Sequence, residues 1–258
     1  MSQKAGNRLV GRRALITGAA GGIAQQTARD FAREGAQLLL TDLDIASLTP
    51  LVEELREAGA TVIAHAADLT QRDEVDALIA AGVSEFGELD ILVTCAGGYT
   101  SYANFEDIEE DDWDRVIDLN LKTVYLCCKA VIPTMKRAGW GRIINLGSLA
   151  GRSTSAGSSP AHYGTAKAGV SVLTQYIAKD VAPYGITANT VAPGTTVTER
   201  VRNVLTPEKE TQFVASTPVG RLAMPEDITG VITFLASDDS RYITGATLDV
   251  NGGRLMLT

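Results

Sequence analysis

Tyr163 and Lys167 form the residue pair with the clearest chemical potential in this sequence. A phenol and an ammonium at positions i and i+4 of a helix lie on the same face. Tyrosine is a poor base at neutral pH because its ordinary pKa is near ~10, but a nearby cation stabilises the phenolate and lowers that pKa. Such a tyrosine can exchange a proton with a substrate hydroxyl or carbonyl. Exposed helix faces also carry Tyr/Lys pairs by chance. The residues around this pair must therefore show whether it has a catalytic role.

Ser148 follows a predicted strand at residues 141–146, and it is placed to hydrogen-bond the same substrate oxygen as Tyr163. Near the N-terminus, a glycine-rich turn with Gly18, Gly21 and Gly22 joins a strand to a helix that begins around Ile23. A pyrophosphate can meet the free N–H groups of such a helix, and glycines let the backbone approach it. A turn of this kind can also be a plain tight connection.

Two aspartates end the next strands of the pattern. Asp42 lies where an acidic side chain accepts hydrogen bonds from the adenosine ribose hydroxyls, and its charge would repel a 2′-phosphate. The glycine turn contains no Arg or Lys. We therefore favour NAD over NADP, with a helix cap as the alternative role for Asp42. Asp68 either reaches the adenine amino group or caps the following helix.

Short apolar runs alternate with segments of helical period, and these elements position the side chains above. We predict strands at 14–17, 37–41, 61–66, 89–94, 141–146, 187–191 and 247–250. The main predicted helices follow Gly22, span about 112–138 and 162–182, and follow Pro225. This alternation predicts an α/β fold, a doubly wound Rossmann-type parallel sheet with helices on both faces, in which ligands bind at the carboxyl ends of the strands. The small residues from Cys95 to Gly98 end one such strand, where an adenosine could lie close to the backbone or the chain could simply turn.

The composition indicates one globular domain. The chain has 258 residues, of which 45% are hydrophobic and 21% are charged, and a formal net charge of -8 argues against nucleic acid or an anionic membrane as a partner. No apolar run approaches the ~18 residues of a membrane span and no signal peptide is evident, so we expect a cytoplasmic protein. The three cysteines and two separated histidines predict neither disulfides nor a metal site.

The order of these motifs resembles that of the short-chain dehydrogenase/reductase family over nearly the whole chain, in the branch of about 250 residues that includes 3-oxoacyl-carrier-protein reductases and polyol and sugar dehydrogenases. The resemblance implies a catalytic tetrad of Asn120, Ser148, Tyr163 and Lys167. It also implies that Lys167 holds the nicotinamide ribose, that Asn120 supports a proton-relaying water, and that the chain forms a homotetramer through its long helices.

The resemblance extends the cofactor site to further residues. It implies that the segment from Pro193 to Thr198 lies along the nicotinamide. The implied cofactor contacts are Gly18, Gly21, Gly22, Ile23, Asp42, Asp68, Leu69, Cys95, Ala96, Gly97, Tyr163, Lys167, Pro193, Gly194, Thr196 and Thr198. The chain departs from the family pattern at three positions: Ala24 replaces a third glycine, Thr196 replaces an aliphatic residue, and Cys95 replaces an asparagine that ties adjacent strands together. The spacing from Ser148 to Tyr163 is also slightly longer than is usual in the family.

We divide the single domain, 1–258, into a cofactor half at about 10–145 and a catalytic half at about 146–258 with a lid at about 195–218. The predicted substrate walls are 98–105, 152–162 and the lid, with Tyr99 and Arg152 as candidate contacts beside Ser148 and Tyr163. Ser155, Ser158, His162, Arg200 and Arg202 belong to the same polar set. Each of these side chains can instead be a solvated loop residue, and His162 can merely begin a helix.

Three hypotheses follow for the function. The first is an NAD(H)-dependent oxidoreductase that interconverts a secondary alcohol and a ketone on a small polar substrate, such as a sugar, a polyol or a hydroxy acid. The second is a 3-oxoacyl-thioester ketoreductase, against which Asp42 and the acidic balance speak. The third is a non-catalytic dinucleotide-binding sensor or scaffold, which would have no need of four groups suited to proton transfer.

Overall fold

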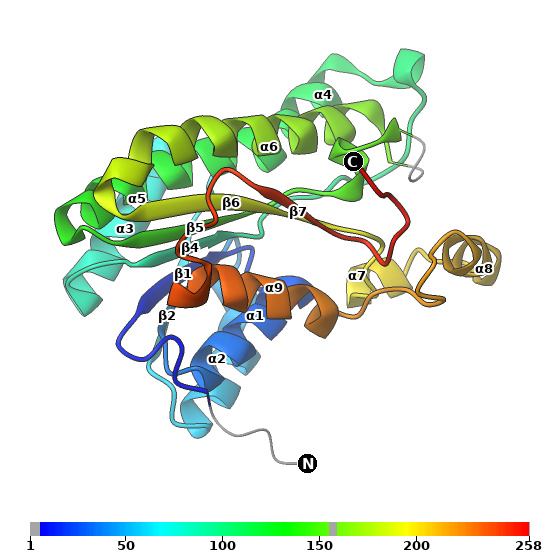
Figure 1. Cartoon of the computed structure of the whole chain (residues 1–258). Coiled ribbons are helices and arrows are strands. Elements are labelled where there is room, and N and C mark those ends of the chain that lie inside the picture. The colour runs from blue at the N-terminus through cyan, green and yellow to red at the C-terminus, as the bar shows by residue number, and fades with distance from the viewer. Residues whose placement is uncertain (1–5, 155–158, 258) are drawn as a thin grey trace.

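The computed structural model describes residues 6–154 and 159–257. Seven parallel strands form one sheet in the order β3-β2-β1-β4-β5-β6-β7. The strands are β1 (Arg13–Thr17), β2 (Gln37–Asp42), β3 (Val62–Ala66), β4 (Ile91–Thr94), β5 (Gly141–Leu146), β6 (Ile186–Pro193) and β7 (Thr247–Val250). Helices cover both faces (Figure 1), so the predicted doubly wound α/β fold is confirmed.

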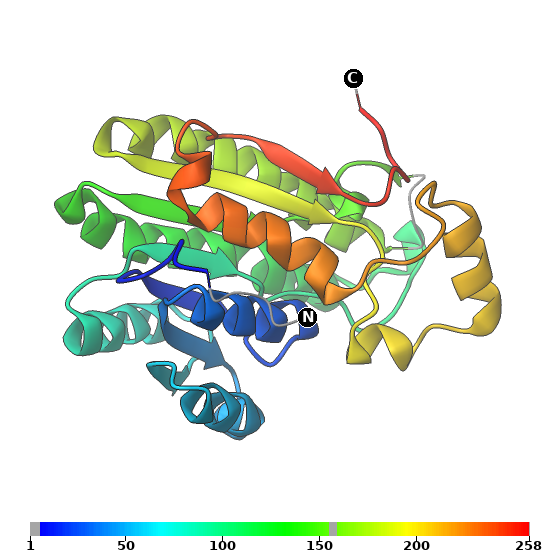
Figure 2. The same ribbon diagram turned by 60° about the horizontal axis from the view of Figure 1, so that its bottom comes forward.

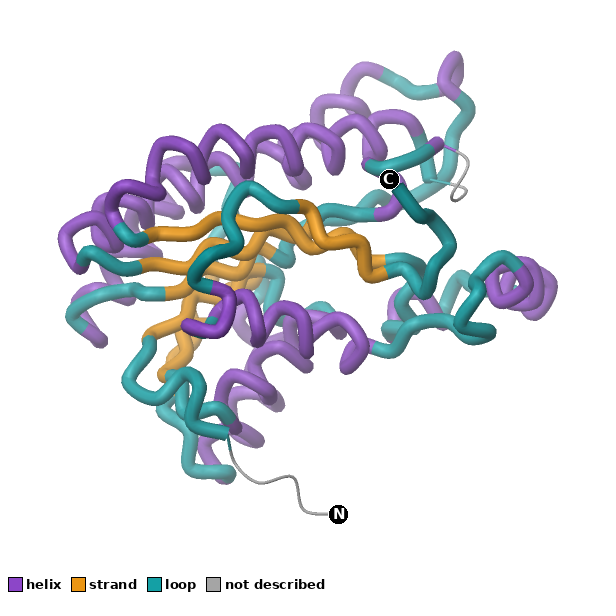
Figure 3. The backbone as a smooth tube through the Cα atoms, in the orientation of Figure 1, coloured by secondary structure: helices purple, strands orange, loops and turns teal. Residues whose placement is uncertain are grey.

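Most of the helices lie in two layers, one on each face of the sheet. The helices are α1 (Gly22–Arg33), α2 (Thr49–Glu57), α3 (Arg72–Phe86), α4 (Glu110–Ile117), α5 (Thr123–Ala138), α6 (Ala161–Val181), α7 (Glu199–Arg202), α8 (Pro207–Ala215) and α9 (Pro225–Ala236). Helices α1, α2 and α9 cover one face of the sheet, and α3, α5 and α6 cover the other (Figure 3). None of the described helices has both the length and the apolar character that crossing a membrane requires.

Successive residues of the central strands enter opposite cores. Leu15 packs with the α3, α5 and α6 side, whereas Ile16 packs with the α1, α2 and α9 side. Leu39 and Leu40 of β2 divide in the same way, and all four side chains are fully buried. A strand that is buried on both faces must be apolar at every position, which explains the continuous apolar runs of the sequence.

The predicted helix at 112–138 differs from the structure in an informative way. It is divided into α4, a π-helical turn at Asp118–Lys122, and α5. A π turn widens the helix by one residue and is common at functional sites. Here it carries Asn120, so the interruption coincides with a predicted catalytic residue.

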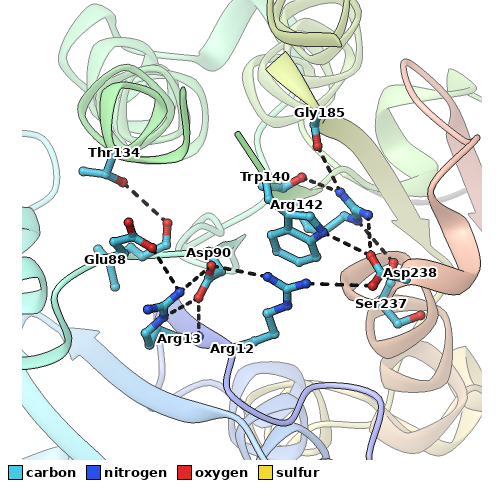
Figure 4. Close-up of polar contacts among 12 residues, drawn as sticks. Arg12, Arg13, Glu88, Asp90, Thr134, Trp140, Arg142, Gly185, Ser237 and Asp238 are labelled. Carbon is cyan, nitrogen blue, oxygen red and sulfur yellow. Dashed lines mark hydrogen bonds and ion pairs between the residues drawn. The ribbon is translucent and has the colours of Figure 1, made fainter. Parts of the chain in front are cut away.

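The amino ends of the strands are closed by a network of charges. Asp90, before β4, accepts hydrogen bonds from the backbone N–H and the guanidinium of Arg13. Buried Arg142 of β5 donates to Asp238 at 2.9 Å, and the guanidiniums of Arg12 and Arg142 lie 3.5 and 4.2 Å from the ring centroid of Trp140. Figure 4 shows these side chains pointing toward one another, so this edge has no free charge among the groups named.

The carboxyl ends of the strands face the opposite way, toward α7 and α8 (Figure 2). These two short helices lie within the predicted lid at 195–218 and project beyond the sheet. The segment is connected to the body by a β-bridge between Thr196 and Ala223. Every predicted catalytic residue lies at or near this edge.

Candidate active site

Tyr163 and Ser148 are brought together from two elements that follow β5. Ser148 begins a short 3-10 turn, and its Oγ accepts a hydrogen bond from the backbone N–H of Ala150 at 3.1 Å. Tyr163 lies in the first turn of α6, and its phenol is near enough to the Ser148 hydroxyl for that hydroxyl to lower the pKa of Tyr163. The two hydroxyls can therefore contact one substrate oxygen together.

Lys167 lies one turn further along α6 and is only 4% exposed. Its Nζ donates to the carbonyl oxygen of Leu146 at 2.8 Å and lies 5.9 Å from the ring centroid of Tyr163. No acidic side chain accepts from this ammonium among the hydrogen bonds of the described residues. Because a buried ammonium is poorly solvated, the pKa of Lys167 is lowered to about 8.

The pKa of Tyr163 moves in the direction opposite to our prediction. Burial raises this pKa above its ordinary value, and the neighbouring Tyr99 adds to the increase. The Ser148 hydroxyl and the charge of Arg200 lower this pKa, but by less than burial raises it. Desolvation disfavours the phenolate and is the largest effect, so Tyr163 holds its proton in this structure.

Asn120 is completely buried beneath the segment that follows β4. Its Oδ1 accepts from the N–H of Gly98 and its Nδ2 donates to the carbonyl of Gly98, both at 2.8 Å. Gly97 has a φ of +151°, and a Cβ there would lie 2.6 Å from Asn120 Oδ1 and 3.2 Å from Lys167 Nζ. The structure therefore brings Asn120, Gly97 and Lys167 into direct contact, and only glycine fits between the other two.

The glycine-rich turn packs tightly against the end of β4. Gly18 has a φ of +61°, and a Cβ on it would lie 2.6 Å from the backbone nitrogen of Ala96. Gly21 caps α1 without any side-chain hydrogen bond, and α1 begins at Gly22, with Ile23 next. The first N–H groups of a helix have no partner within the helix, so this end of α1 is suited to a phosphate.

Asp42 lies at the end of β2 and contacts the same turn. Its Oδ2 accepts from the N–H of Ala20 at 3.0 Å, and its Oδ1 accepts from the N–H of Leu43 at 2.8 Å. The following 3-10 helix is capped by Asp44 instead. Asp42 is therefore an anchor of the glycine turn, which leaves its predicted contact with the ribose as a prediction.

Asp68 orders a turn before α3. Its Oδ1 accepts from the N–H of Thr70 at 2.9 Å and from the hydroxyl of Thr70 at 2.7 Å, and these bonds lower the pKa of Asp68. The residue at the N-cap of α3 is Gln71, so Asp68 does not cap that helix directly. Leu69 is 6% exposed and packs in the core.

Cys95 and Ala96 are held by a hydroxyl that our sequence analysis did not single out. Thr17 Oγ1, at the end of β1, accepts from the N–H of Cys95 at 3.1 Å and from the N–H of Ala96 at 3.3 Å. The neighbouring Thr94 donates to Asn145 Oδ1 at 2.9 Å and so connects β4 to β5. These bonds join the strands at the position where Cys95 replaces an asparagine.

A groove of about 680 Å³ extends from the glycine turn to α7. Its lining includes Gly21, Gly22, Thr198 and Arg200. A Cβ on Gly22 would lie 2.9 Å from Thr198 Cγ2, which places the two predicted cofactor segments side by side. Uncapped N–H groups, a glycine cradle and a groove beside them are the features that a dinucleotide requires, so these residues fit that cofactor.

Pro193, Gly194 and Thr196 lie where β6 leads into this groove. Gly194 donates to the carbonyl of Val250 at 2.9 Å, and Thr196 Oγ1 donates to the carbonyl of Gly194 at 3.2 Å. Thr198 caps α7 by accepting from the N–H of Val201 at 3.4 Å. The predicted nicotinamide segment thus forms an ordered connection between the sheet and the lid.

Comparisons with known proteins agree with this arrangement. A family model described as enoyl-(acyl carrier protein) reductase matches residues 18–254. The chain is 37% identical to a cyclohexanol dehydrogenase of Rhodococcus sp. (strain TK6), covering 95% of this chain and 96% of the relative. It is 39% identical to the 3-oxoacyl-(acyl-carrier-protein) reductase FabG of Staphylococcus aureus (strain Mu50 / ATCC 700699), covering 94% and 98%.

A crystal structure of a short-chain type dehydrogenase/reductase from Mycobacterium marinum superposes with a TM-score of 0.91 at 32% identity, covering 96% of this chain and 97% of that one. The chain belongs to the short-chain dehydrogenase/reductase family. It is therefore an oxidoreductase that acts on CH–OH groups, interconverting a secondary alcohol and a ketone as the sequence predicted.

Two predicted substrate contacts of this short-chain dehydrogenase/reductase have different surroundings. The ring of Tyr99 lies 4.9 Å from the ring of Tyr163, measured between centroids, so Tyr99 forms a wall of the site. Arg152 instead forms two hydrogen bonds to Asp249, at 3.0 and 3.1 Å. Its charge is balanced within the protein, which makes it a poor candidate for binding an anion. Ser155 and Ser158 lie outside the described residues.

His162 contacts the backbone of Tyr163, the predicted catalytic tyrosine. It is completely buried, its Nδ1 accepts from the backbone N–H of Tyr163 at 2.9 Å, and its Nε2 lies 3.1 Å from Asp112 Oδ2. These contacts connect α4 to the first turn of α6. Nothing in the local sequence pairs residues 50 positions apart, which is why the sequence analysis offered only a helix start for His162.

Proposed function

We propose that this short-chain dehydrogenase/reductase uses NAD(H) to interconvert a small polar secondary alcohol, such as a sugar, a polyol or a hydroxy acid, and the corresponding ketone. One observation carries the proposal: the side chains of Tyr163 and Ser148 lie together at the same edge where Lys167, Gly97 and Asn120 meet. This cluster has a proton donor, a hydrogen-bond donor and a buried cation, and Arg200, which contacts Tyr99 beside it, lines the groove.

The residues have distinct roles in this proposal. Tyr163 exchanges a proton between its phenol oxygen and the substrate oxygen, and Ser148 donates a hydrogen bond to that oxygen. In ketone reduction the phenol proton moves to the carbonyl oxygen, and in alcohol oxidation the hydroxyl proton moves to the phenolate. The nicotinamide, when bound, supplies or accepts the hydride. Lys167 stabilises the phenolate, and Asn120 fixes the backbone of Gly98 and so the floor of the site.

The cofactor would lie along the groove. The N-terminus of α1, with Gly21 and Gly22, is suited to the pyrophosphate, and the segment from Pro193 to Thr198 is suited to the nicotinamide end. Asp42 supports NAD over NADP because its carboxylate would repel a 2′-phosphate. The division of the domain at about residue 146 stays a prediction, since Asn120 precedes that boundary and the segment from Pro193 to Thr198 follows it.

The reaction is tested by following reduced-nicotinamide absorbance with purified protein, NAD or NADP, and a panel of polyols, sugars, hydroxy acids and cyclohexanol. We expect turnover with NAD and at least one of these alcohols. Preferential reduction of an acetoacetyl thioester with NADPH would instead support the second candidate, a 3-oxoacyl-thioester ketoreductase, which the similarity to FabG favours. Binding of a dinucleotide without any turnover would support a sensor or scaffold.

Asp42→Asn separates the charge of this side chain from its structural role. The amide oxygen of asparagine can still accept a hydrogen bond in the glycine turn, while the negative charge is lost. We expect kcat/KM with NADP to rise relative to NAD by about tenfold or more, because one charge–phosphate repulsion is removed. Discrimination that stays at the wild-type ratio would contradict the ribose role. Asp44→Asn, in the neighbouring exposed cap, is the control.

A homotetramer and a cytoplasmic location stay predictions. Partly exposed apolar or aromatic side chains on the long helices support self-association: Tyr125 on α5 is 42% exposed, and Val172 and Tyr176 on α6 are 52% and 68% exposed. Sedimentation analysis of the wild type and of Val172→Glu tests the assembly. A dissociated variant would support an interface on α6, and a monomeric wild type would contradict it.

A further inference from the structure

Arg200, the second residue of α7, stands apart from most arginines of the described residues. Arg13, Arg142 and Arg152, for example, each lie within 4 Å of a carboxylate. Among the ion pairs of residues 6–154 and 159–257, none involves Arg200. Other described arginines, such as Arg202 and Arg254, also lack an ion pair, so the position of Arg200 decides what this cation can bind.

The position of Arg200 connects the lid to the catalytic tyrosine. Its Nη2 donates to the carbonyl oxygen of Tyr99, and its guanidinium occupies the space that a Cβ on Gly98 would fill. The ring of Tyr99 packs on the ring of Tyr163, and the charge of Arg200 acts on the phenol of Tyr163. The guanidinium therefore lies beside the segment that Asn120 holds and near Tyr163, and it also lines the groove that reaches the glycine turn.

The donors of Arg200 are only partly used. A guanidinium has five N–H donors in a planar fork, and the fork matches the two oxygens of a carboxylate. The bond to Tyr99 uses one donor, and the side chain is exposed. Arg152, another cation that we predicted at the substrate walls, already donates hydrogen bonds to both carboxylate oxygens of Asp249. Arg200 is consequently the better placed of the two to bind an anion.

We propose that Arg200 binds a carboxylate of the substrate, so that the preferred substrate is a hydroxy acid, or the corresponding keto acid, whose carbinol or carbonyl oxygen meets Tyr163 and Ser148. This inference rests on the proposed function, because it selects one substrate class among those that the function allows. The carboxylate lies beside the Gly98–Tyr99 backbone, and binding it also fixes α7 over the site.

Matched substrates test the proposal. The 2-, 3- and 4-hydroxy isomers of cyclohexanecarboxylate and their methyl esters are each assayed with NAD, since an acid and its ester differ in charge but hardly in shape. We expect at least one acid to exceed its ester in kcat/KM by about tenfold to a hundredfold, the range of a charge-assisted hydrogen bond. Arg200→Met should remove that preference while leaving the ester unchanged, and Arg200→Lys should restore part of it because it keeps the charge without the fork.

Arg202→Met is the matched control. Arg202 lies two residues along α7, is exposed and lines the same groove as Arg200, but no contact joins it to Tyr99 or Gly98 among the described residues. We expect it to keep the preference for the acid. Thermal unfolding of all three variants should match that of the wild type, since both side chains are exposed.

The outcomes separate this inference from the proposed function. Wild-type protein that oxidises the esters or other alcohols but prefers none of the acids overturns the role of Arg200 and leaves the proposed function intact. A preference that survives in Arg200→Met overturns it as well. An increased KM for NAD with acid and ester alike would assign the guanidinium to the cofactor phosphates and contradict the proposal. Protein without any alcohol or ketone turnover contradicts the proposed function itself.

Discussion

At the amino ends of the strands, the buried charges of Asp90 and Arg142 are matched with opposite charges. At the carboxyl ends, Arg152 is paired with Asp249, but Lys167 and Arg200 have no ion pair among the described residues. Asp90 is only 1% exposed and accepts from Arg13, while buried Arg142 is paired with Asp238 (Figure 4). At the other edge, buried Lys167 donates to a backbone carbonyl and Arg200 donates to another. Buried charges are costly unless they are paired.

The difference suggests how one sheet serves two purposes. Side chains fill the amino edge and neutralise one another there, which leaves nothing for a ligand. Glycines and backbone groups dominate the carboxyl edge, so the space and the unmatched charges are available to a cofactor and a substrate. Changes at the amino edge should therefore affect stability, and changes at the carboxyl edge should affect turnover.

The largest expected effect is at the carboxyl edge. Tyr163→Phe keeps the ring against Tyr99 and removes only the hydroxyl that we propose as the proton-transferring group. We expect kcat to fall by about 10²- to 10⁴-fold, the usual contribution of a general acid or base, with the melting temperature and cofactor affinity unchanged. Steady-state kinetics, thermal unfolding and cofactor titration measure the three quantities.

Tyr176→Phe is the control for this substitution, because Tyr176 is an exposed tyrosine on the same helix. It should leave kcat unchanged. If Tyr163→Phe instead lowered the melting temperature and spared turnover, the contrast between the two edges would be reversed.

The next effect is at the amino edge. Arg13→Met removes the cation that contacts Asp90 through its side chain, leaving a buried carboxylate with the backbone N–H and the more distant Arg12, at 3.7 Å. We expect the free energy of unfolding to fall by about 3 kcal/mol, as when one partner of a buried pair is removed. Urea unfolding measures this change, while kcat/KM of the folded enzyme should stay at the wild-type value.

Arg29→Met provides the comparison with an exposed pair. Arg29 and Glu54 are joined at 2.7 Å, but their side chains are 33% and 49% exposed, so we expect a loss below about 1 kcal/mol. Equal losses in the two variants would show that burial of Asp90 does not determine the stability of the amino edge. A large loss of turnover in Arg13→Met would show that the two edges are coupled.

The last prediction concerns how the free energy of unfolding depends on pH through Lys167. Burial lowers the pKa of Lys167 from 10.5 to about 8, so the unfolded chain holds this proton more tightly than the folded chain does. The folded state is penalised below pH 8, and the penalty disappears as the pH rises toward 10.5. The stability of the wild type relative to Lys167→Met should therefore increase across this interval, by at most about 3 kcal/mol.

Urea unfolding of both proteins at several pH values tests this expectation. Lys179→Met is the control, because Lys179 is exposed on the same helix and should show no such dependence on pH. A difference between the wild type and Lys167→Met that stays constant from pH 8 to 10.5 would mean that the lysine is not destabilised in the folded state.

The sequence by itself determined much of this protein. The strands β5 and β7 begin and end where the apolar pattern predicted, and the glycine turn, Asp42 and the order of Ser148, Tyr163 and Lys167 indicated both the fold and the reaction class. These inferences succeed because periodicity, turn chemistry and helical spacing are local properties, each of which depends on a few neighbouring residues.

The tertiary structure alone decided which charges are neutralised. It paired Arg152 with Asp249, 97 residues away, placed Asp112 against His162, and left Arg200 beside Tyr163 without a described acidic partner. It also reversed the expected shift of the Tyr163 pKa and inserted a π turn at Asn120. Ion pairing and desolvation depend on neighbours that the fold brings together from distant parts of the chain, so no local pattern contains them.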